Sequence, residues 1–484
     1  MINVIFVASE AAPFAKTGGL ADVAGSLPKA LNSDAINVKV YMPLHIKIAP
    51  HFREQMNYLG YTTINMGWRT QYVGLYTMTY EGVEYYFIDN EFYFKRHALY
   101  GDGDDAERYI YFSKAVLAAI KMQGIKPDII HTNDWHTASI NVLLDYYRKH
   151  DAFYQDIKTV FTIHNLRYQG VFDAYVMGDL LDLPYEYFHE DRLKFYDSIN
   201  ILKGGIVFSD YVTTVSNTYA HEITYPYFGE NLDGVINKYS YKLSGIVNGI
   251  DTDVYNPETD ANIPAHYGTD TLENKKSVKR ALQERFGLTV SDDIPILAMV
   301  TRLADMKGLD LIEHILEELM HLEPEVQLVV LGTGESRYEN LFRHYQYRFP
   351  NKLAARIYFD QTESHMIYAG SDIFLMPSLF EPCGLSQLIA LRYGTIPVVR
   401  QIGGLKDTVT PYNKFTGEGN GFGFMNYNAH ELLFTIKDAL TLYRDAPAWQ
   451  SLMKQAMSAD NSWNKSSKDY LAIYSKVLGK EITR

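Results

Sequence analysis

The sequence predicts an α/β protein made of two Rossmann-like, doubly wound domains that face one another across a cleft. The chain has 484 residues, which is too long for one hydrophobic core and indicates at least two large domains. Short apolar or β-branched runs alternate with longer helical stretches, and this alternation stops near residues 244–249 before it starts again. We therefore expect one domain over residues 1–245 and a second over residues 246–460. Residues 461–484 are expected to form a C-terminal helix that crosses back to the first domain.

The apolar runs in each half have the length and composition of buried parallel strands. In the first half they cover residues 4–9, 38–43, 128–132, 159–165 and 211–216. In the second half they cover residues 296–302, 326–334, 355–359, 372–378 and 396–400. A turn-rich stretch, NGIDTDVYNPETD, and a helix-prone segment near residues 273–286 separate the two sets. Such folds bind ligands at the carboxyl ends of their strands, so we look for site residues there.

Composition and charge narrow the function classes. Apolar residues make up 47% of the chain and charged residues 21%, as in ordinary globular proteins, and the formal net charge is −13. This charge argues against non-specific binding to nucleic acid or to an anionic membrane, although it leaves room for a local phosphate pocket. The single cysteine, Cys383, excludes an internal disulfide and fits a reducing compartment. With no secretory leader pattern and no apolar stretch of about 18 residues, we expect a cytoplasmic protein without nucleic-acid or membrane partners.

The segment KTGGL follows the first apolar run and places a lysine beside two glycines. A strand that enters a Gly-containing turn and then a helix points backbone N–H groups at whatever lies beyond the strand. Gly18 and Gly19 leave the backbone open to a ligand, and Lys16 adds a mobile positive charge. The segment predicts an anion site, and a plain turn with a solvated lysine is the alternative.

Two cations follow the first strand of the second half. Arg302 ends the run ILAMVTR, and Lys307 comes five residues later, before a helix that we expect to start after Gly308. An arginine in bidentate contact and a lysine as a point charge can together hold a diphosphate at such a position. Two ordinary surface charges are the alternative.

The stretch PSLFEPCGLSQL carries a carboxylate, Glu381, where another strand ends and where we expect a helix to begin. This carboxylate can bond a ligand hydroxyl, face a developing positive charge, or only cap the helix. A second Gly-Gly-Leu turn, at residues 403–405, follows the last strand run and predicts a further anion or sugar contact.

Histidines and short polar residues gather at the ends of two strands in the first half. The segment HTNDWHTA contains His131, Asp134, Trp135 and His136, and TIHNLRYQG contains His164 and Asn165. We predict that these groups bond sugar hydroxyls, with Trp135 as an apolar floor. A zinc site is the weaker interpretation, because no Cys-x-x-Cys or His-Glu-x-x-His pattern accompanies them. Each histidine taken alone can also be a satisfied structural residue.

Two further features have plain structural interpretations. Cys383 can be a reactive thiol near a helix start, but a small buried filler is preferred because no histidine lies near it in sequence. The 39 tyrosines can stack on sugar rings, but tyrosine in place of phenylalanine at half-buried positions is the simpler interpretation.

Seven segments taken together resemble the signature sequences of bacterial glycogen synthases and plant starch synthases. In the family's order they are KTGGLADVAGSLPKAL, HTNDWHTA, TIHNLRYQG, VNGID, the TRL…KG turn, PSLFEPCGLSQLIALRYG and GGLKDTV, between about Val4 and about Thr410. The resemblance implies the two-domain architecture called GT-B. It also implies elongation of glycogen by retaining transfer of glucose from ADP-glucose to the non-reducing 4-OH of an α-1,4-glucan, with no metal and no cofactor.

The resemblance also implies roles for individual residues. The first domain would be the acceptor side and the second the nucleotide-sugar side. Arg302 and Lys307 would hold the donor's diphosphate, with Glu381 beside the transferred glucose. Lys16, Gly18 and Gly19 would complete the phosphate site from the facing domain when the cleft closes.

Further residues receive roles by the same resemblance. His164 and Asp134 would lie next to the reacting carbons, and Asn248 in a loop at the domain junction. The remaining donor-binding residues would be Gly384, Leu385, Gly403 and Gly404.

The charges that develop on the sugar and on the leaving phosphate in this reaction suit a site that contains one carboxylate and several cations. Breaking the bond from glucose C1 to the diphosphate leaves positive charge on the sugar and negative charge on the leaving oxygen, which a carboxylate and cations can stabilise. Retention usually indicates a carboxylate nucleophile. For this family, front-face attack assisted by the departing phosphate is preferred, and Glu381 as a nucleophile is the minority hypothesis.

Two positions depart from the family pattern, and several rival functions stay open. Met306 stands where the family often has Gln, and Ile402 where it usually has Thr or Ser, which puts nucleotide affinity or preference in question. The rivals are a transferase that uses UDP-glucose or a small acceptor, a glucan phosphorylase, and a catalytically silent carbohydrate-binding protein. The phosphorylase is disfavoured because no lysine setting resembles that family's pyridoxal phosphate site, and the silent protein because binding alone needs no diphosphate clamp.

Overall fold

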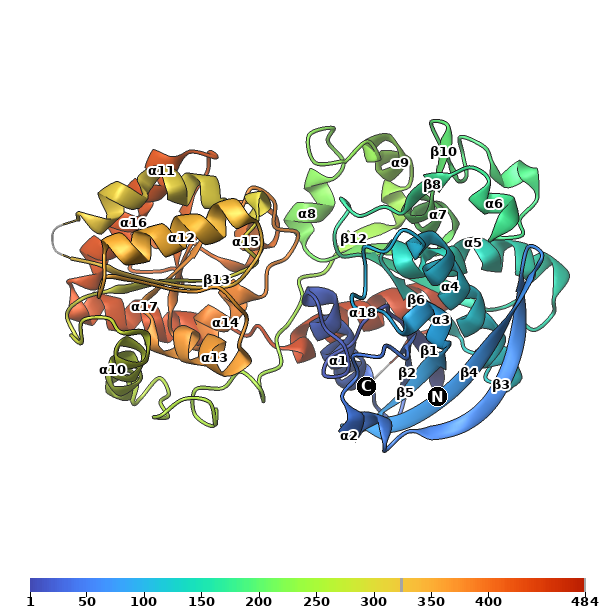
Figure 1. Cartoon of the computed structure of the whole chain (residues 1–484), viewed down its shortest axis with the longest axis horizontal. Helices are drawn as coiled ribbons and strands as arrows, with labels where there is room; N and C mark the ends of the chain where they lie inside the picture. Colours follow the sequence, from blue (N-terminus) through green and yellow to red (C-terminus); the bar gives the residue numbers. More distant parts are fainter. Residues whose placement is uncertain (323–324, 483–484) are drawn as a thin grey trace. The chain divides into compact units, whose positions relative to one another are not determined.

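The computed structural model describes residues 1–322 and 325–482, and the chain divides into two compact units (Figure 1). Unit 1 comprises Met1–Asn248 and Trp463–Arg484, and unit 2 comprises Gly249–Ser462. The divisions therefore fall a few residues beyond the ends predicted at 245 and 460. No helix in the described parts of the chain is long and apolar enough to cross a bilayer.

Unit 1 is built on a nine-stranded sheet. In spatial order its strands are β12 (Leu243–Gly245), β11 (Tyr211–Thr214), β7 (Lys158–Ile163), β6 (Ile129–Asn133), β1 (Ile2–Val7), β2 (Ile36–Pro43), β5 (Val83–Asp89), β4 (Arg69–Tyr80) and β3 (Asn57–Met66). The pairs from β12 to β5 are parallel, and β5, β4 and β3 pair antiparallel. A second, three-stranded sheet contains β8 (Val171–Asp173), β10 (Ser198–Asn200) and β9 (Lys194–Phe195).

The helices of unit 1 connect these strands and cover the sheet. They are α1 (Gly19–Leu31), α2 (Pro50–Arg53), α3 (Glu91–Phe94), α4 (Asp105–Met122), α5 (Trp135–His150), α6 (Val176–Asp179), α7 (Ile201–Phe208), α8 (Asn217–Glu222), α9 (Asp233–Lys238) and α18 (Trp463–Leu478), with short 3₁₀ turns η1 (Tyr185–Tyr187) and η2 (Ser240–Lys242). Helix α18 comes from the end of the chain, yet its Tyr470 and Tyr474 are buried in the same core as Phe6 and Leu27. The C-terminal helix is therefore part of unit 1.

Unit 2 is a six-stranded, all-parallel sheet. Its strands in spatial order are β15 (Leu353–Arg356), β14 (Gln327–Leu331), β13 (Ile296–Val300), β16 (Ile373–Met376), β17 (Ile396–Arg400) and β18 (Phe422–Phe424). Its helices are η3 (Leu272–Asn274), α10 (Lys275–Phe286), η4 (Asp305–Lys307), α11 (Leu309–Met320), α12 (Ser336–Arg348), α13 (Gln361–Gly370), α14 (Ser386–Arg392), α15 (Gly403–Thr408), α16 (Ala429–Tyr443) and α17 (Ala446–Ser458). Strands β13 and β14 are buried along their whole length, as expected for a sheet covered by helices on both faces.

The predicted fold class is confirmed, and each predicted strand run overlaps a strand of one of the two large sheets. The region between residues 57 and 89 is different from the prediction, because it adds two long antiparallel strands to an otherwise parallel sheet. A partial signal is present in the sequence: polar and apolar residues alternate over residues 63–66 and 76–80, and Gly67, in the turn between the two strands, takes φ 57°.

Candidate active site

A small cavity of about 60 Å³ in unit 2 lies where β13 and β16 end. Its polar lining includes Thr301, Lys307, Ser378 and Glu381, and Gly384 and Leu385 close one side. Four of these six residues were predicted from the sequence as donor-site residues. The carboxyl edge of a parallel sheet is the usual place for a ligand in an open α/β fold.

An ion pair between Lys307 and Glu381 dominates this cavity. The Lys307 ammonium lies 2.7 Å from Glu381 Oε2, and the same oxygen accepts a hydrogen bond of 3.1 Å from the Ser378 hydroxyl. Both side chains are largely buried, with exposed fractions of 19% for Lys307 and 8% for Glu381. A cation and an anion at one sheet edge can face the opposite charges that form when a sugar–phosphate bond breaks.

Gly308 sets the position of the lysine. It takes φ 72°, and a Cβ there would lie 2.0 Å from the carbonyl oxygen of Pro377. The 3₁₀ turn η4 can end beside β16 and lead directly into α11 because this residue has no side chain.

The prediction that a helix begins at Glu381 is wrong, and so is its alternative role as a cap. Helix α14 begins at Ser386, and the residue before it, Leu385, makes no side-chain cap. Glu381 lies in the loop between β16 and α14, where its carboxylate is engaged by Lys307 and Ser378. Cys383 in the same loop is buried, in agreement with the filler interpretation.

The second glycine pair, Gly403 and Gly404, packs against the backbone of the loop that carries Glu381. A Cβ on Gly403 would lie 2.0 Å from the carbonyl oxygen of Glu381, and one on Gly404 would lie 2.1 Å from that of Cys383. The Gly404 amide donates a 3.1 Å hydrogen bond to the Glu381 carbonyl. The pair lets α15 pack against the backbone of this loop, a structural use that the sequence did not indicate.

Arg302 and the two departures from the family pattern are sequence neighbours of residues already described: Arg302 follows Thr301, Met306 precedes Lys307, and Ile402 precedes Gly403. The Arg302 side chain is exposed, and within residues 1–322 and 325–482 it makes no ion pair or side-chain hydrogen bond. Met306 and Ile402 are both buried, at 8% and 3% exposure. Ile402 precedes α15 without a side-chain cap, which is the hydroxyl contact that Thr or Ser could make.

In unit 1, the KTGG segment leads into α1. Lys16 is exposed and forms a 2.6 Å ion pair with Asp22 on that helix. Gly18 precedes α1 with extended backbone (φ −158°), and Gly19 is the first residue of the helix. Gly18 therefore does not use the left-handed conformation that only glycine adopts easily, and a Cβ there would meet only Glu10 Oε1, at 3.9 Å, so the fold itself does not require glycine at this position.

A buried carboxylate holds this segment in place. Glu10 Oε2 accepts hydrogen bonds from the Thr17 backbone amide at 2.5 Å and the Thr17 hydroxyl at 2.8 Å. Burial raises the pKa of the Glu10 carboxyl to about 7, against the opposing effect of the Thr17 bonds. Neither Glu10 nor Asp22 was singled out in the sequence, because each gains its role through a partner that only the fold identifies.

We expect Glu10→Gln to change how the stability of the protein depends on pH. The folded protein keeps the Glu10 proton up to about pH 7, whereas a glutamate with its ordinary pKa of 4.5 releases it earlier. The folded state binds more protons between these values, so this group makes stability fall as pH rises from about 4.5 to 7. Glutamine still accepts the Thr17 bonds without a charge, so the variant should be more stable at pH 8 by about 1–3 kcal/mol.

Denaturant unfolding at pH 4 and pH 8 measures this effect. The advantage of Glu10→Gln should disappear at pH 4, and the same substitution at the exposed Glu54 should change neither curve. Burial also raises the pKa of Asp134 to about 7, and the nearby Glu10 carboxylate adds a smaller part of that increase, so Glu10→Gln also relieves Asp134 and the two effects at pH 8 have the same sign. Equal stability of wild type and Glu10→Gln at both pH values would contradict the prediction.

The predicted pair Asp134 and His164 come together at the ends of β6 and β7. Asp134 has φ 56°, and its Oδ1 accepts the backbone amides of His164 at 2.7 Å and Asn165 at 3.4 Å. Its carboxylate therefore positions the loop that carries His164. Burial lowers the pKa of His164 to about 3, so its imidazole is neutral.

Asn133, which the sequence analysis passed over, orients the imidazole of His164. Asn133 Nδ2 donates to the Val7 carbonyl at 3.0 Å, which leaves its Oδ1 as the acceptor for His164 Nε2 at 2.8 Å. Nε2 thus carries the hydrogen, and Nδ1 can accept a hydrogen bond from a hydroxyl.

Three further residues predicted as sugar contacts in this region, His131, Trp135 and His136, are instead buried in the interior of unit 1. His131 is fully buried between Tyr474 and Thr162, at 2.7 and 2.6 Å, so it is a satisfied structural residue. Trp135 is covered by Gly170, where a Cβ would lie 2.5 Å from the indole, so it offers no open floor. His136 is buried at 9% exposure and packs on Trp135 with 4.2 Å between ring centroids.

Asn248 is the last residue before unit 2. Its side chain is 5% exposed, and its Oδ1 has no hydrogen-bond partner among the described residues. A buried amide oxygen without a donor is an acceptor held ready for a ligand or a water.

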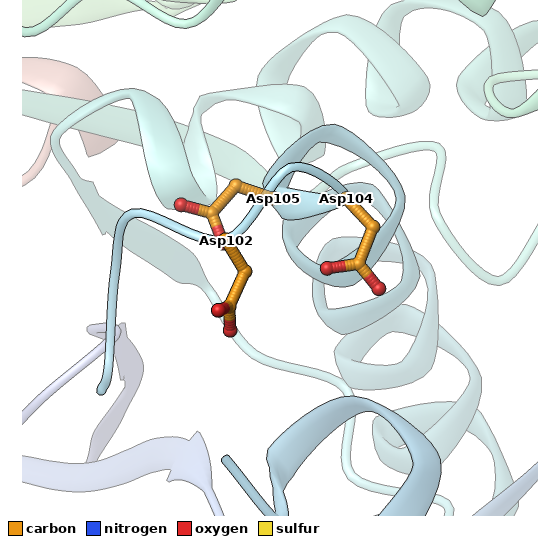
Figure 2. A group of neighbouring side chains, drawn as sticks. All are labelled: Asp102, Asp104 and Asp105. Atoms are coloured by element: carbon orange, nitrogen blue, oxygen red, sulfur yellow. The ribbon is translucent and has the colours of Figure 1, made fainter. Parts of the chain in front are cut away.

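The histidines of the described residues do not gather into a group close enough to share a metal ion. Within the described residues, the group of acidic and histidine side chains close enough to hold a metal is Asp102, Asp104 and Asp105, before and at the start of α4 (Figure 2). Two arginines already neutralise these carboxylates: Arg108 pairs with Asp102 and Asp105 at 3.0 and 2.6 Å, and Arg96 with Asp104 at 2.7 Å. These ion pairs fix the loop before α4 in place and account for the three carboxylates.

Comparisons with known proteins match both units. Residues 3–238 match the family model described as starch synthase catalytic domain, and residues 282–454 the model described as glycosyl transferases group 1. A glycogen synthase of Bacillus cereus (strain Q1) is 51% identical over 99% of this chain and all of its own length. One from Caldicellulosiruptor saccharolyticus is 54% identical over the same shares of the two chains.

Two solved structures of glycosyltransferases are similar to this chain over almost its whole length. The catalytic domain of Starch Synthase IV from Arabidopsis thaliana, bound to ADP and acarbose, superposes with a TM-score of 0.92 at 34% identity, over 99% of this chain and 100% of its own. Sucrose-phosphate synthase from Thermosynechococcus elongatus shares the fold, with a TM-score of 0.63 and 16% identity over 99% of this chain and 100% of its own.

Proposed function

This chain belongs to the glycogen synthase and starch synthase family and is a glucosyltransferase of the GT-B fold, and from that premise we propose how it works. It transfers glucose from ADP-glucose to the non-reducing 4-OH of an α-1,4-glucan, with retention of the anomeric configuration. The observation that carries the proposal is the Lys307–Glu381 pair at the sheet edge of unit 2, together with Arg302, which is exposed and makes no ion pair with any described residue.

Lys307 and Arg302 bind the donor's diphosphate in this mechanism. As the bond from glucose C1 to the phosphate oxygen breaks, the electron pair stays on that oxygen, and the two cations stabilise the charge that accumulates there. Gly384, Leu385, Gly403 and Gly404 shape the walls of the donor site, and Lys16, Gly18, Gly19 and Asn248 are further donor-binding residues.

Glu381 faces the positive charge that forms on the sugar. Its Oε2 is already bonded by Lys307 and Ser378, which lowers its value as a nucleophile and favours a stabilising role. The acceptor 4-OH then attacks C1 from the face that the phosphate leaves, and its proton passes to the departing phosphate oxygen. This sequence retains configuration without a covalent enzyme intermediate.

His164 acts on the acceptor side. Its neutral imidazole presents Nδ1 as a hydrogen-bond acceptor for a glucose hydroxyl, while Asn133 holds Nε2. Asp134 is a positioning residue, since its carboxylate bonds backbone amides of the His164 loop.

Transfer of labelled glucose to glycogen tests the proposal. We expect incorporation from ADP-glucose in the presence of EDTA, much weaker incorporation from UDP-glucose, and release of the new label by an α-1,4-specific glucosidase. A preference for UDP-glucose would overturn the donor assignment. Loss of transfer in EDTA would overturn the metal-free mechanism, and label resistant to the glucosidase would overturn retention. The cytoplasmic location stays a prediction, which fractionation of the source cells would test.

A further inference from the structure

Residues 301–307 follow β13 in unit 2 and carry both Arg302 and Lys307, and we call them the clamp loop. The ion pair between Lys307 and Glu381 fixes one end of this loop. Arg302, near the other end, makes no ion pair with any described residue. The position of Arg302 must therefore be set by the backbone of the loop and by what lies against it, which is the segment 332–335 between β14 and α12.

The clamp loop continues the pairing of β13 with β14 beyond the ends of both strands. The Thr301 amide donates a hydrogen bond of 3.1 Å to the carbonyl of the last residue of β14. The Leu303 amide donates to the Thr333 carbonyl at 3.0 Å, and the Leu303 carbonyl accepts from the Glu335 amide at 2.7 Å. Arg302 lies between these bonded residues, so its backbone has a fixed position relative to β14.

Two glycines let the segments come this close. A Cβ on Gly332 would lie 1.8 Å from the Thr301 carbonyl oxygen, and one on Gly334 would lie 2.2 Å from that of Leu303. Both contacts are with backbone atoms of the clamp loop, so a side chain at either position would push the loop away from β14. The sequence of the segment after β14 therefore favours close attachment of the clamp loop.

Two side chains complete the attachment where the clamp loop turns into η4. Glu335 Oε1 accepts a hydrogen bond of 3.1 Å from the Asp305 backbone amide. The Asp305 carboxylate in turn accepts a hydrogen bond from the hydroxyl of Tyr338, which lies on α12. Asp305 is exposed, whereas the Tyr338 ring is fully buried. A ring fixed in the core of unit 2 therefore holds an exposed turn, and through that turn it holds Lys307, two residues further on.

Asp305 has the wrong charge to bind the ligand of this loop itself. A free carboxylate two residues before Lys307 would compete with a diphosphate for the cation, because both are anions. The Tyr338 hydroxyl engages this carboxylate and so limits the positions that its charge can take. Burial and the hydrogen bond to Asp305 raise the pKa of the Tyr338 hydroxyl above its usual value, so the hydroxyl keeps the proton that it donates. The pair therefore suits control of the neighbouring cation better than contact with a ligand.

We propose that Tyr338 and Asp305 are positioning residues, which hold the clamp loop in the conformation that binds the diphosphate of the donor. Tyr338 acts through Asp305 on the spacing of Arg302 and Lys307. The proposal rests on the function proposed above, since the nucleoside diphosphate of that reaction is the ligand concerned. Two cations that are already in place bind a diphosphate more tightly than two cations on a loop that must first become ordered.

Tyr338→Phe tests the proposal, because it removes the hydroxyl and keeps the buried ring. We expect the Kd for ADP, measured by calorimetry, and the KM for ADP-glucose to rise about tenfold, the effect of one hydrogen bond to a charged group. The kcat should fall less than about threefold, because the bound diphosphate itself orders the loop.

Asp305→Asn and Asp305→Leu both remove the charge, but only asparagine keeps an oxygen acceptor for Tyr338. The leucine variant should therefore bind ADP about tenfold more weakly than the asparagine variant. Tyr187→Phe is the matched control, since Tyr187 in unit 1 is also fully buried and donates to an aspartate, at 2.6 Å. It should lose a similar amount of folding stability and bind ADP as wild type does.

Three results would overturn the proposal. An unchanged Kd for ADP in Tyr338→Phe would show that the clamp loop does not depend on the hydroxyl. Equal affinities of Asp305→Asn and Asp305→Leu would show that the charge matters and the hydrogen bond does not. An equal loss of ADP affinity in Tyr187→Phe would make the effect one of general stability. If Tyr338→Phe weakens ADP binding while ADP-glucose donates no glucose to glycogen, the positioning role stands and the proposed function fails.

Discussion

Lys307→Ala is expected to lower kcat for glucose transfer by about 10²- to 10³-fold, because it removes a cation that meets the charge on the departing phosphate. Among the described residues, the same change leaves the Ser378 hydroxyl as the one remaining side-chain partner of the Glu381 carboxylate, which is 8% exposed. Breaking one side of a buried ion pair costs about 3 kcal/mol or more of folding stability. A loss of activity in the single variant therefore has two candidate causes, a missing catalytic charge and a damaged loop.

The double variant Lys307→Met/Glu381→Gln separates these causes. It replaces both charges with neutral groups of similar size, so stability measured by denaturant unfolding should return to within about 1 kcal/mol of wild type. Activity should stay as low as in Lys307→Ala, because neither charge is available to the transition state. Lys352→Ala is the matched control, since Lys352 also forms an ion pair in unit 2, at 3.4 Å from Glu325, but does not line the cavity. Recovery of activity in the double variant would show that the ion pair only supports the loop.

The sequence predicted the parallel sheets well because their strands are buried on both faces. Such strands are continuous apolar runs, as in ILAMV and QLVVL, and each corresponds to one strand of unit 2. The hairpin formed by β3 and β4 was missed for the opposite reason. One of its faces is exposed, so its apolar residues are interrupted by threonine, asparagine and glutamine, and no continuous run marks it.

The sequence predicted only part of the candidate site. The residues that it missed act through hydrogen bonds to other side chains or to the backbone, and those pairings exist only in the folded chain. Lys307 and Glu381 are far apart in sequence, but each stands at the carboxyl end of a strand, and the sheet topology brings such ends together. Glu10 and Asn133 act through Thr17 and His164, and no spacing rule predicts those pairings. His131 shows the converse error, because a histidine near a strand end looks functional until Tyr474, from the far end of the chain, is found against it.

The second glycine pair shows how a backbone contact can control a catalytic side chain, and Gly404→Ala tests it. A Cβ at this position would lie 2.1 Å from the Cys383 carbonyl oxygen and 2.4 Å from the Cys383 Cα, and both are backbone atoms that cannot rotate away. The loop that carries Glu381 must then move away from α15, which also breaks the bond from the Gly404 amide to the Glu381 carbonyl.

We expect Gly404→Ala to lower kcat by about 10²-fold, since a displacement of about 1 Å in a catalytic group has this effect. We also expect a loss of about 2–4 kcal/mol in the free energy of unfolding, as for other overpacked or strained sites. Gly234→Ala is a matched control, because Gly234 is also the second residue of a six-residue helix and an added Cβ meets nothing within 4 Å. That variant should keep full activity and equal or exceed wild-type stability, because alanine favours helix more than glycine does. Normal activity in Gly404→Ala would mean that the Glu381 loop tolerates displacement, and the position of Glu381 would then have to be set by Lys307 and Ser378 alone.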